Sequence, residues 1–128
     1  MKTVHVAAGI IRQGNAVLAA QRGYGDFKDG WEFPGGKVET GERPEDACTR
    51  EIREELSVEV TLGERLCRVE YDYPDFHLTM DCFWCAITQG EIHDTEHESL
   101  RWLTKDQLWD VEWLPANLDI IKQIERLP

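Results

Sequence analysis

The chain has 128 residues, 41% of them hydrophobic and 30% charged, and its formal net charge is −11 at pH 7. This size and mixture predict one compact domain, residues 1–128, with a modest core. The excess of carboxylates argues against a nucleic-acid polymer as partner, because such binding depends on Lys and Arg that neutralise phosphates. No segment is apolar over the length that crosses a bilayer, so we expect no membrane partner.

The first half of the chain predicts a hairpin, a loop and a helix. Apolar runs at residues 3–11 and 16–21 predict two strands, joined by a turn at Gln13-Gly14-Asn15. Residues 22–30 are polar and rich in glycine, which predicts a loop. A helix is expected over residues 44–56, where proline at the first position is well tolerated.

The second half predicts further strands before it returns to helix. Long strands are expected at residues 58–73 and 77–88, and a short one at 100–103. Thr104 and Gln107 form a capping box for a brief helix. A last helix, opened by Pro115, has Leu118, Ile121, Ile124 and Glu125 at helical spacing. Elements that mix without strict alternation favour an α+β fold, in which helices flank a mixed sheet.

The most informative stretch is the window of residues 36–58. Its specified positions are Gly36, Glu42, Arg50, Glu51, Glu54 and Glu55. On a helix, the last three glutamates stand at i, i+3 and i+4 and point the same way. Oxygen ligands after a Gly-rich turn suit Mg²⁺ or Mn²⁺, which bind phosphate oxygens alongside carboxylates. The alternative is a solvated charged helix, but six residue types at fixed offsets favour phosphoryl or diphosphate cleavage.

This spacing resembles the signature of the Nudix hydrolases, Gly-x5-Glu-x7-Arg-Glu-U-x-Glu-Glu-x-Gly-U, where U is bulky and apolar. Ile52 and Val58 fill the U positions. Ser57 stands where the signature has its last glycine, so we expect either a small backbone cost or a slightly different helix end. The segments WEFPGGKVE, EHESLRW and LPAN extend the resemblance to the MutT-type nucleoside triphosphate pyrophosphohydrolases within the family.

The resemblance implies the α/β/α Nudix sandwich, with the signature as a loop-helix-loop. It also implies Mg²⁺-dependent hydrolysis of a nucleoside triphosphate to the monophosphate and pyrophosphate, with Mn²⁺ as a substitute. A metal ion between carboxylates and phosphates also reconciles this acidic chain with an anionic substrate.

The metal and catalytic roles are assigned to residues of the signature. We expect Glu54 and Glu55 to be metal ligands, with the carbonyl of Gly36 as a further oxygen. Glu51 is expected to share the metal and to act as general base or hold the attacking water. Arg50, four residues before Glu54, is expected to orient a carboxylate without touching substrate.

A further acidic ligand is expected from the segment DTEHESLRW. Glu96 and Glu98 are both candidates, and the resemblance favours Glu96, counted back from Trp102. The alternative is a solvated acidic loop, since loop carboxylates are usually exposed.

Five residues are expected to bind substrate. Asn117 resembles the asparagine with which MutT-type enzymes hold an oxidised guanine, because its amide offers an acceptor and a donor; a helix N-cap is the alternative. Phe33 is expected against the base or sugar, and Arg22 against phosphate. Lys37 binds phosphate or closes its loop. Phe76 stands where the MutT pattern has an arginine, which leaves stacking as its contribution.

These residues predict a small-molecule nucleotide substrate, with 8-oxo-dGTP as the first candidate and nucleotide-pool sanitisation, a DNA-repair function, as the role. EHESLRW also resembles CTP pyrophosphohydrolases, so a CTP- or dCTP-type substrate is the alternative. A non-catalytic Nudix-like module is a third reading, although such modules commonly lose the signature carboxylates, which this chain retains. Both a monomer and a homodimer are compatible with the sequence.

The four cysteines, Cys48, Cys67, Cys82 and Cys85, form neither a paired zinc signature nor a dense disulfide framework. Cys82 and Cys85 make a C-x-x-C within a predicted strand, where residues three apart face opposite sides. We therefore expect reduced thiols without a metal or redox role in that motif, which fits a cytoplasmic protein.

Overall fold

The computed structural model describes residues 1–94 and 96–127 and is built on a seven-stranded mixed sheet. At its centre, β1 (Lys2–Gln13) runs parallel to β6 (Phe76–Gln89) and antiparallel to β2 (Ala16–Arg22). The strand order is β3-β2-β1-β6-β5, with β4 paired to β1 and β7 to β2. These further strands are β3 (Trp31–Glu32), β4 (Gly35–Lys37), β5 (Glu59–Asp72) and β7 (His97–Thr104).

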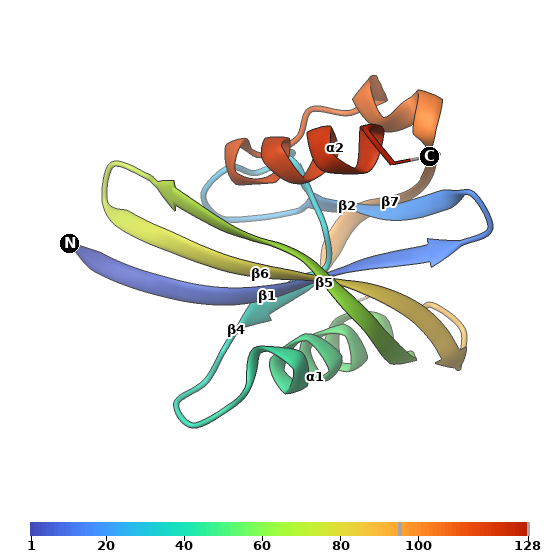
Figure 1. The fold of residues 1–128 in the computed structure, drawn as a ribbon, viewed down its shortest axis with the longest axis horizontal. Coiled ribbons are helices and arrows are strands. Elements are labelled where there is room, and N and C mark those ends of the chain that lie inside the picture. Colours follow the sequence, from blue (N-terminus) through green and yellow to red (C-terminus); the bar gives the residue numbers. More distant parts are fainter. Residues whose placement is uncertain (95, 128) are drawn as a thin grey trace.

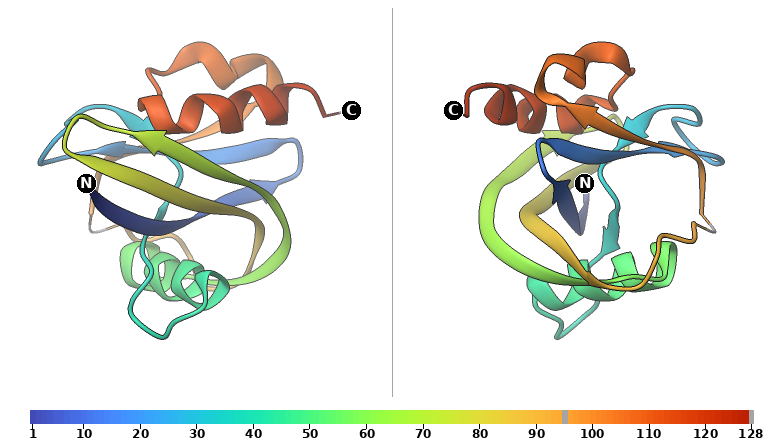
Figure 2. Two further views of the ribbon diagram at one scale, coloured as in Figure 1. Left: turned by 60° about the vertical axis from the view of Figure 1, so that its left-hand side comes forward. Right: turned by 90° about the vertical axis from the view of Figure 1, so that its right-hand side faces the viewer.

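Helices cover the sheet from two sides (Figure 1). On one side lies α1 (Pro44–Leu56), and on the other lies α2 (Leu118–Glu125), next to the 3-10 helices η1 (Lys105–Asp110) and η2 (Pro115–Asn117). The two views of Figure 2 show the same three layers. This arrangement confirms the predicted α+β fold with a mixed sheet flanked by helices. Within the described residues, no helix has the length and apolarity needed to cross a membrane.

The strongest local patterns agree with the structure. The predicted hairpin is present, with Arg12 opposite Val17, and α1 has the predicted bounds. Ser57, the C-cap of α1, adopts φ 61° and ψ 30°, so the left-handed helix end is kept without glycine, the first of the two expected outcomes. Its N–H donates to the carbonyl of Arg53 at 3.0 Å and closes the helix.

Two short strands and one helix start differ from the sequence prediction. Strands β3 and β4 have only two and three residues, too few for an alternating pattern, and the Gly-Gly pair of β4 carries no strand signal. The last helix begins with the tighter turn η2, which changes the phase of the following residues. Leu118 is consequently exposed, and Ile120 is buried beside Ile121.

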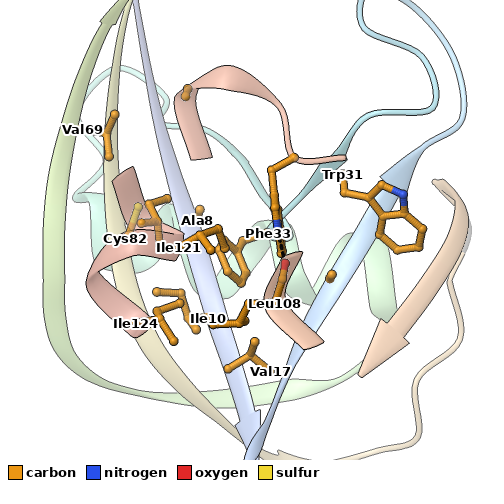
Figure 3. Close-up of a cluster of buried hydrophobic side chains, with 14 of the residues drawn as sticks. Ala8, Ile10, Val17, Trp31, Phe33, Val69, Cys82, Leu108, Ile121 and Ile124 are labelled. Atoms are coloured by element: carbon orange, nitrogen blue, oxygen red, sulfur yellow. Dashed lines mark hydrogen bonds between the residues drawn. The ribbon is translucent and has the colours of Figure 1, made fainter. Parts of the chain in front are cut away.

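Alternating side chains of β1 build a core on each face of the sheet. Ala7 and Ile11 pack under α1, whereas Ala8 and Ile10 pack towards α2. Figure 3 shows the second cluster, with Ile10 beside side chains of α2 and β6. A Cβ at Gly9 would lie 2.5 Å from the Cδ1 of Ile52, so this glycine lets α1 approach the sheet closely. The polar residues of α1 are thereby held in a fixed position relative to β1 and β4.

Candidate active site

A cavity of about 550 Å³ is lined by β1, β4 and β6, by the C-terminal end of α1, by residues 22–27 and by η2. Most of the predicted site residues meet there although they are far apart in the sequence. The predicted residues in its wall are Arg22, Phe33, Gly36, Lys37, Glu55, Phe76, Glu96 and Asn117. The other three, Arg50, Glu51 and Glu54, stand on α1 outside the wall.

Arg50 is surrounded by oxygen atoms. Its Nε and Nη2 donate to both carboxylate oxygens of Glu42, at 2.9 and 3.0 Å, and its Nη1 donates to Glu51 Oε1 at 2.8 Å. Nη2 also donates to the carbonyl of Lys37 at 2.9 Å, whereas the predicted contact with Glu54 is longer, at 3.4 Å. These hydrogen bonds lower the pKa of Glu42 to about 2. Arg50 therefore ties the loop after β4 to the helix and orients two carboxylates.

Glu51 lies directly over Gly36. A Cβ on Gly36 would sit 2.5 Å from Glu51 Oε2, so any larger residue would displace this carboxylate. Glu51 is one-fifth exposed, whereas Glu54 is 59% exposed and faces outward. The predicted helical spacing is present, but the three glutamates have different surroundings.

Of the three glutamates of the signature helix, Glu55 is the one in the cavity wall. Its side chain is only 14% exposed, and Oε2 has no hydrogen-bond partner among the described residues. Burial, together with the negative charges of Glu51 and Glu32, raises the pKa of Glu55 to about 9. A buried oxygen among like charges is a position that a cation would stabilise.

The structure separates the two candidates for the downstream ligand. Glu96 lies in the cavity wall, and its Oε2 accepts a hydrogen bond from the hydroxyl of Tyr24 at 3.0 Å. Glu98 lies outside the cavity wall, with its carboxylate 3.9 Å from Lys28 Nζ. The geometry therefore favours Glu96 over Glu98.

Two further residues of the wall were not singled out from the sequence. Glu32 precedes the Gly-rich turn, and His97 follows Glu96. The Nδ1 of His97 lies 3.2 Å from Asp94 Oδ1, and its Nε2 lies 3.8 Å from Glu55 and 3.9 Å from Glu32. In the sequence, both residues are marked only by their place inside the segments WEFPGGKVE and EHESLRW. They come together in the structure because strands β3 and β7 both pair with β2.

Aromatic residues and one amide also line the cavity. Asn117 is buried, and its Oδ1 accepts the N–H of Phe33 at 3.4 Å. Asn117 stands at the N-cap position of α2, but its side chain makes no capping hydrogen bond to that helix. The carbonyl oxygen can accept a second hydrogen bond, and both amide hydrogens can donate. Phe76 lies in the cavity wall and stacks on Tyr73, with ring centroids 5.0 Å apart; its stacking on a substrate stays a prediction.

The two predicted phosphate contacts differ in how far their side chains are engaged within the protein. Arg22 donates to Glu32 from Nη2 at 2.6 Å and from Nε at 3.3 Å, and to the carbonyl of Asp26 at 3.0 Å. Lys37 has an exposed side chain beside the cavity, and its carbonyl holds Arg50. Lys37 is thus available to a ligand, whereas Arg22 would share its guanidinium with Glu32.

The donor set was compared with the needs of a divalent cation. The described residues contain no three Asp, Glu, His or Cys side chains already gathered as a finished metal site. The partnerless oxygen of Glu55, with Glu51, Glu32 and Glu96 close enough to raise its pKa, nevertheless supplies hard oxygen ligands of the kind that Mg²⁺ and Mn²⁺ prefer. These residues fit a bound divalent cation.

Comparisons with known proteins cover nearly the whole chain. The family model described as NUDIX domain matches residues 1–124. The chain is 35% identical over 130 residues to an 8-oxo-dGTP diphosphatase of Escherichia coli K12, covering 99% of this chain and 100% of that protein. It is 31% identical over 123 residues to the CTP pyrophosphohydrolase of the same organism, covering 95% and 91%. The solution structure of the E. coli ORF135 protein superposes with a TM-score of 0.82 at 30% identity, covering 96% and 89%.

Proposed function

This chain belongs to the NUDIX family, and we propose that it is a divalent-metal-dependent pyrophosphohydrolase acting on a nucleoside triphosphate. The reaction adds one water to the triphosphate and releases the monophosphate and pyrophosphate. The observation that carries the proposal is the carboxylate of Glu55, buried without a partner at a cavity that also contains Asn117 and Phe76. The relatives named as diphosphatase and pyrophosphohydrolase support it.

The site residues divide the work of hydrolysis. Glu51 accepts a proton from the attacking water, and Arg50 holds that carboxylate in place through the 2.8 Å hydrogen bond. Arg50 also fixes the loop that carries the carbonyl of Gly36, through the carbonyl of Lys37. Lys37 contributes a positive charge next to the polyphosphate.

Mg²⁺, or Mn²⁺ in its place, would be held by Glu51, Glu54, Glu55, Glu96 and the carbonyl of Gly36. When bound, the ion supplies positive charge for the phosphate oxygens and lowers the pKa of water. Glu54 reaches such a site only by turning from its exposed position, whereas Glu55 already faces the cavity.

The base is recognised at the aromatic end of the cavity, and we infer an oxidised purine, 8-oxo-dGTP, as the substrate. Oxidation at C8 converts N7 from an acceptor to an N–H donor, and Asn117 Oδ1 keeps one lone pair free for such a donor. A buried carbonyl oxygen that needs a hydrogen-bond donor favours the N7–H of 8-oxoguanine strongly over the N7 acceptor of ordinary guanine. Nucleotide-pool sanitisation in the cytoplasm would be the cellular role.

A pyrimidine nucleotide is the second candidate. Phe76 replaces the arginine of the MutT pattern and stacks on Tyr73, and Phe27 contacts Tyr73 from the loop, with centroids 5.2 Å apart. An aromatic wall stacks on any base without reading its edge. The relative named CTP pyrophosphohydrolase supports this candidate.

A panel of nucleotides tests both candidates together. We would measure kcat/KM for 8-oxo-dGTP, dGTP, CTP and dCTP, with Mg²⁺ and with EDTA, and identify the products. The proposal expects 8-oxo-dGTP to exceed dGTP by at least tenfold, and pyrophosphate rather than phosphate to be released. If dCTP or CTP exceeds 8-oxo-dGTP by more than tenfold, the oxidised-purine assignment is wrong and the pyrimidine assignment replaces it. Activity that survives EDTA unchanged would contradict the metal dependence.

A further inference from the structure

Two of the four cysteines face each other across the strand pair β5 and β6. Cys67 of β5 lies directly opposite Cys82 of β6 in the antiparallel register. A bulge between Arg65 and Cys67 creates this pairing. Without that extra residue, Cys67 would lie opposite Asp81, because a shift of one residue changes both partner and face.

The backbone geometry of this pair suits a disulfide. Directly opposed residues of antiparallel strands have Cα atoms roughly 4.5 to 5.5 Å apart, which lies within the range of about 4.4 to 6.8 Å seen in disulfides. Both side chains point to the face covered by α2, where Cys82 belongs to the core cluster and Cys67 packs against it. The two sulfur atoms therefore need little backbone movement to bond.

Cys67 has the surroundings of a reactive thiol. It is partly exposed, whereas Cys48, Cys82 and Cys85 are buried. The Cys82 thiol lowers the pKa of Cys67 most, and Gln123 of α2 and Arg65 also lower it, whereas partial burial and Asp119 oppose the shift. The thiolate is the nucleophilic form, so exposure and charge favour reaction at Cys67.

The second pair of cysteines offers a matched contrast. A Cβ at Gly9 would lie 2.9 Å from Cys85 Sγ and 3.3 Å from Cys48 Sγ, so these two thiols lie close together under α1. Both are buried. A hydrogen bond with Cys85 and burial raise the pKa of Cys48. In both pairs the two thiols lie close together, but only the pair with Cys67 has a thiol that solvent can reach.

We propose that Cys67 and Cys82 are an oxidisable dithiol site, which hydroperoxides convert to a cross-strand disulfide. The Cys67 thiolate attacks one oxygen of hydrogen peroxide, the O–O bond breaks, and Cys67 becomes a sulfenic acid as hydroxide leaves. Cys82 sulfur then attacks the Cys67 sulfur, and water leaves. In sum, two thiols and one hydrogen peroxide give one disulfide and two waters, with two electrons passing from sulfur to peroxide. A thiol reductant such as dithiothreitol reverses the bond.

The test measures the mass of the whole protein before and after peroxide. Reduced full-length chain is treated with a small molar excess of hydrogen peroxide, the free thiols are alkylated, and the intact mass is recorded. We expect two alkylated thiols instead of four and a bond that dithiothreitol removes. The thermal midpoint of the oxidised form should exceed that of the reduced form by several degrees, because the crosslink restricts the unfolded chain.

Single serine variants identify the pair. C67S and C82S should each abolish the crosslink, whereas C48S and C85S should retain it. If C82S folds poorly because its position is buried, C67S provides the test, since a serine at the partly exposed position 67 should leave the fold intact. Retention of all four thiols, stable oxygen adducts in place of a bond, or loss of the crosslink in C48S or C85S would each overturn the proposal.

Discussion

Two carboxylates at helix α1, Glu42 in the loop before it and Glu55 near its C-terminal end, differ in how their charge is balanced. Around Arg50, the charges are matched inside the protein, and the pKa of Glu42 falls to about 2. One turn further along the helix, Glu55 has a partnerless buried oxygen, and its pKa rises to about 9. The first region is complete in the free protein and gives rigidity. In the second region burial and neighbouring carboxylates raise the pKa of Glu55, which is why we propose it as the metal-binding end of the helix.

The largest effect is expected at Glu51, which joins the two regions. Glu51→Gln keeps the shape but removes the proton acceptor, so we expect kcat to fall by roughly 10³-fold or more. Steady-state hydrolysis of the preferred nucleotide, with pyrophosphate detection, measures this. Glu45→Gln, at an exposed position in the first turn of the same helix, is the matched control. Equal activity of the two variants would remove Glu51 from the mechanism.

Arg50 tests the balanced region directly. Arg50→Lys keeps the charge, but an ammonium cannot span Glu42, Glu51 and the carbonyl of Lys37 at the same time. We expect kcat to fall by about 10- to 100-fold, and the thermal midpoint to fall by several degrees. Arg43→Lys, which alters an exposed pair with Asp46, is the control for charge and side-chain type. A variant with normal kcat would show that the balanced region serves stability alone.

Variants of Glu96 and Glu98 test which of these two residues is the downstream metal ligand. We expect Glu96→Gln to lower kcat/KM by about tenfold, because the loss of one carboxylate weakens the metal site. Glu98→Gln should stay within about twofold, since its carboxylate lies towards Lys28 outside the cavity wall. Titration with Mg²⁺ should show a higher metal requirement for the first variant. The reverse order of effects would assign the downstream ligand to Glu98.

The pH dependence of stability tests the unbalanced region without an activity assay. Because the folded pKa of Glu55 lies above its ordinary value of 4.5, its stabilising contribution is complete below that pH. That contribution is lost as the pH rises towards 9, with a slope of at most about 1.4 kcal/mol per pH unit. Urea unfolding of the metal-free protein from pH 5 to 9 should show this decline, and Glu55→Gln should flatten it.

Magnesium supplies the control for the same experiment. At pH 8 it should raise the thermal midpoint of the wild-type protein and have a smaller effect on Glu55→Gln, because a ligand stabilises the state that binds it. If the free energy of unfolding of the wild-type protein changes with pH as little as that of Glu55→Gln, the Glu55 carboxylate is solvated in solution.

Sequence reasoning succeeded where the signal is local. The bounds of α1 followed from Pro44 and from the periodic signature, and Ser57 indicated a left-handed helix end. Eight of the predicted residues line one cavity; helical spacing pointed to Glu55, but most of the others came from the resemblance to a family, since spacing alone does not bring Glu96 near Glu55. Glu32 and His97 escaped notice because β3, β2 and β7 must pair before these side chains meet the site.

The sequence by itself determined the helix, its line of carboxylates and the hairpin, because the interactions that define them join residues a few positions apart. Only the tertiary structure decided which carboxylate lacks a partner and which cysteines face each other. Burial depends on elements far apart in the chain, and strand register depends on a single extra residue at the bulge before Cys67. Such non-local pairings leave no periodic trace in the sequence.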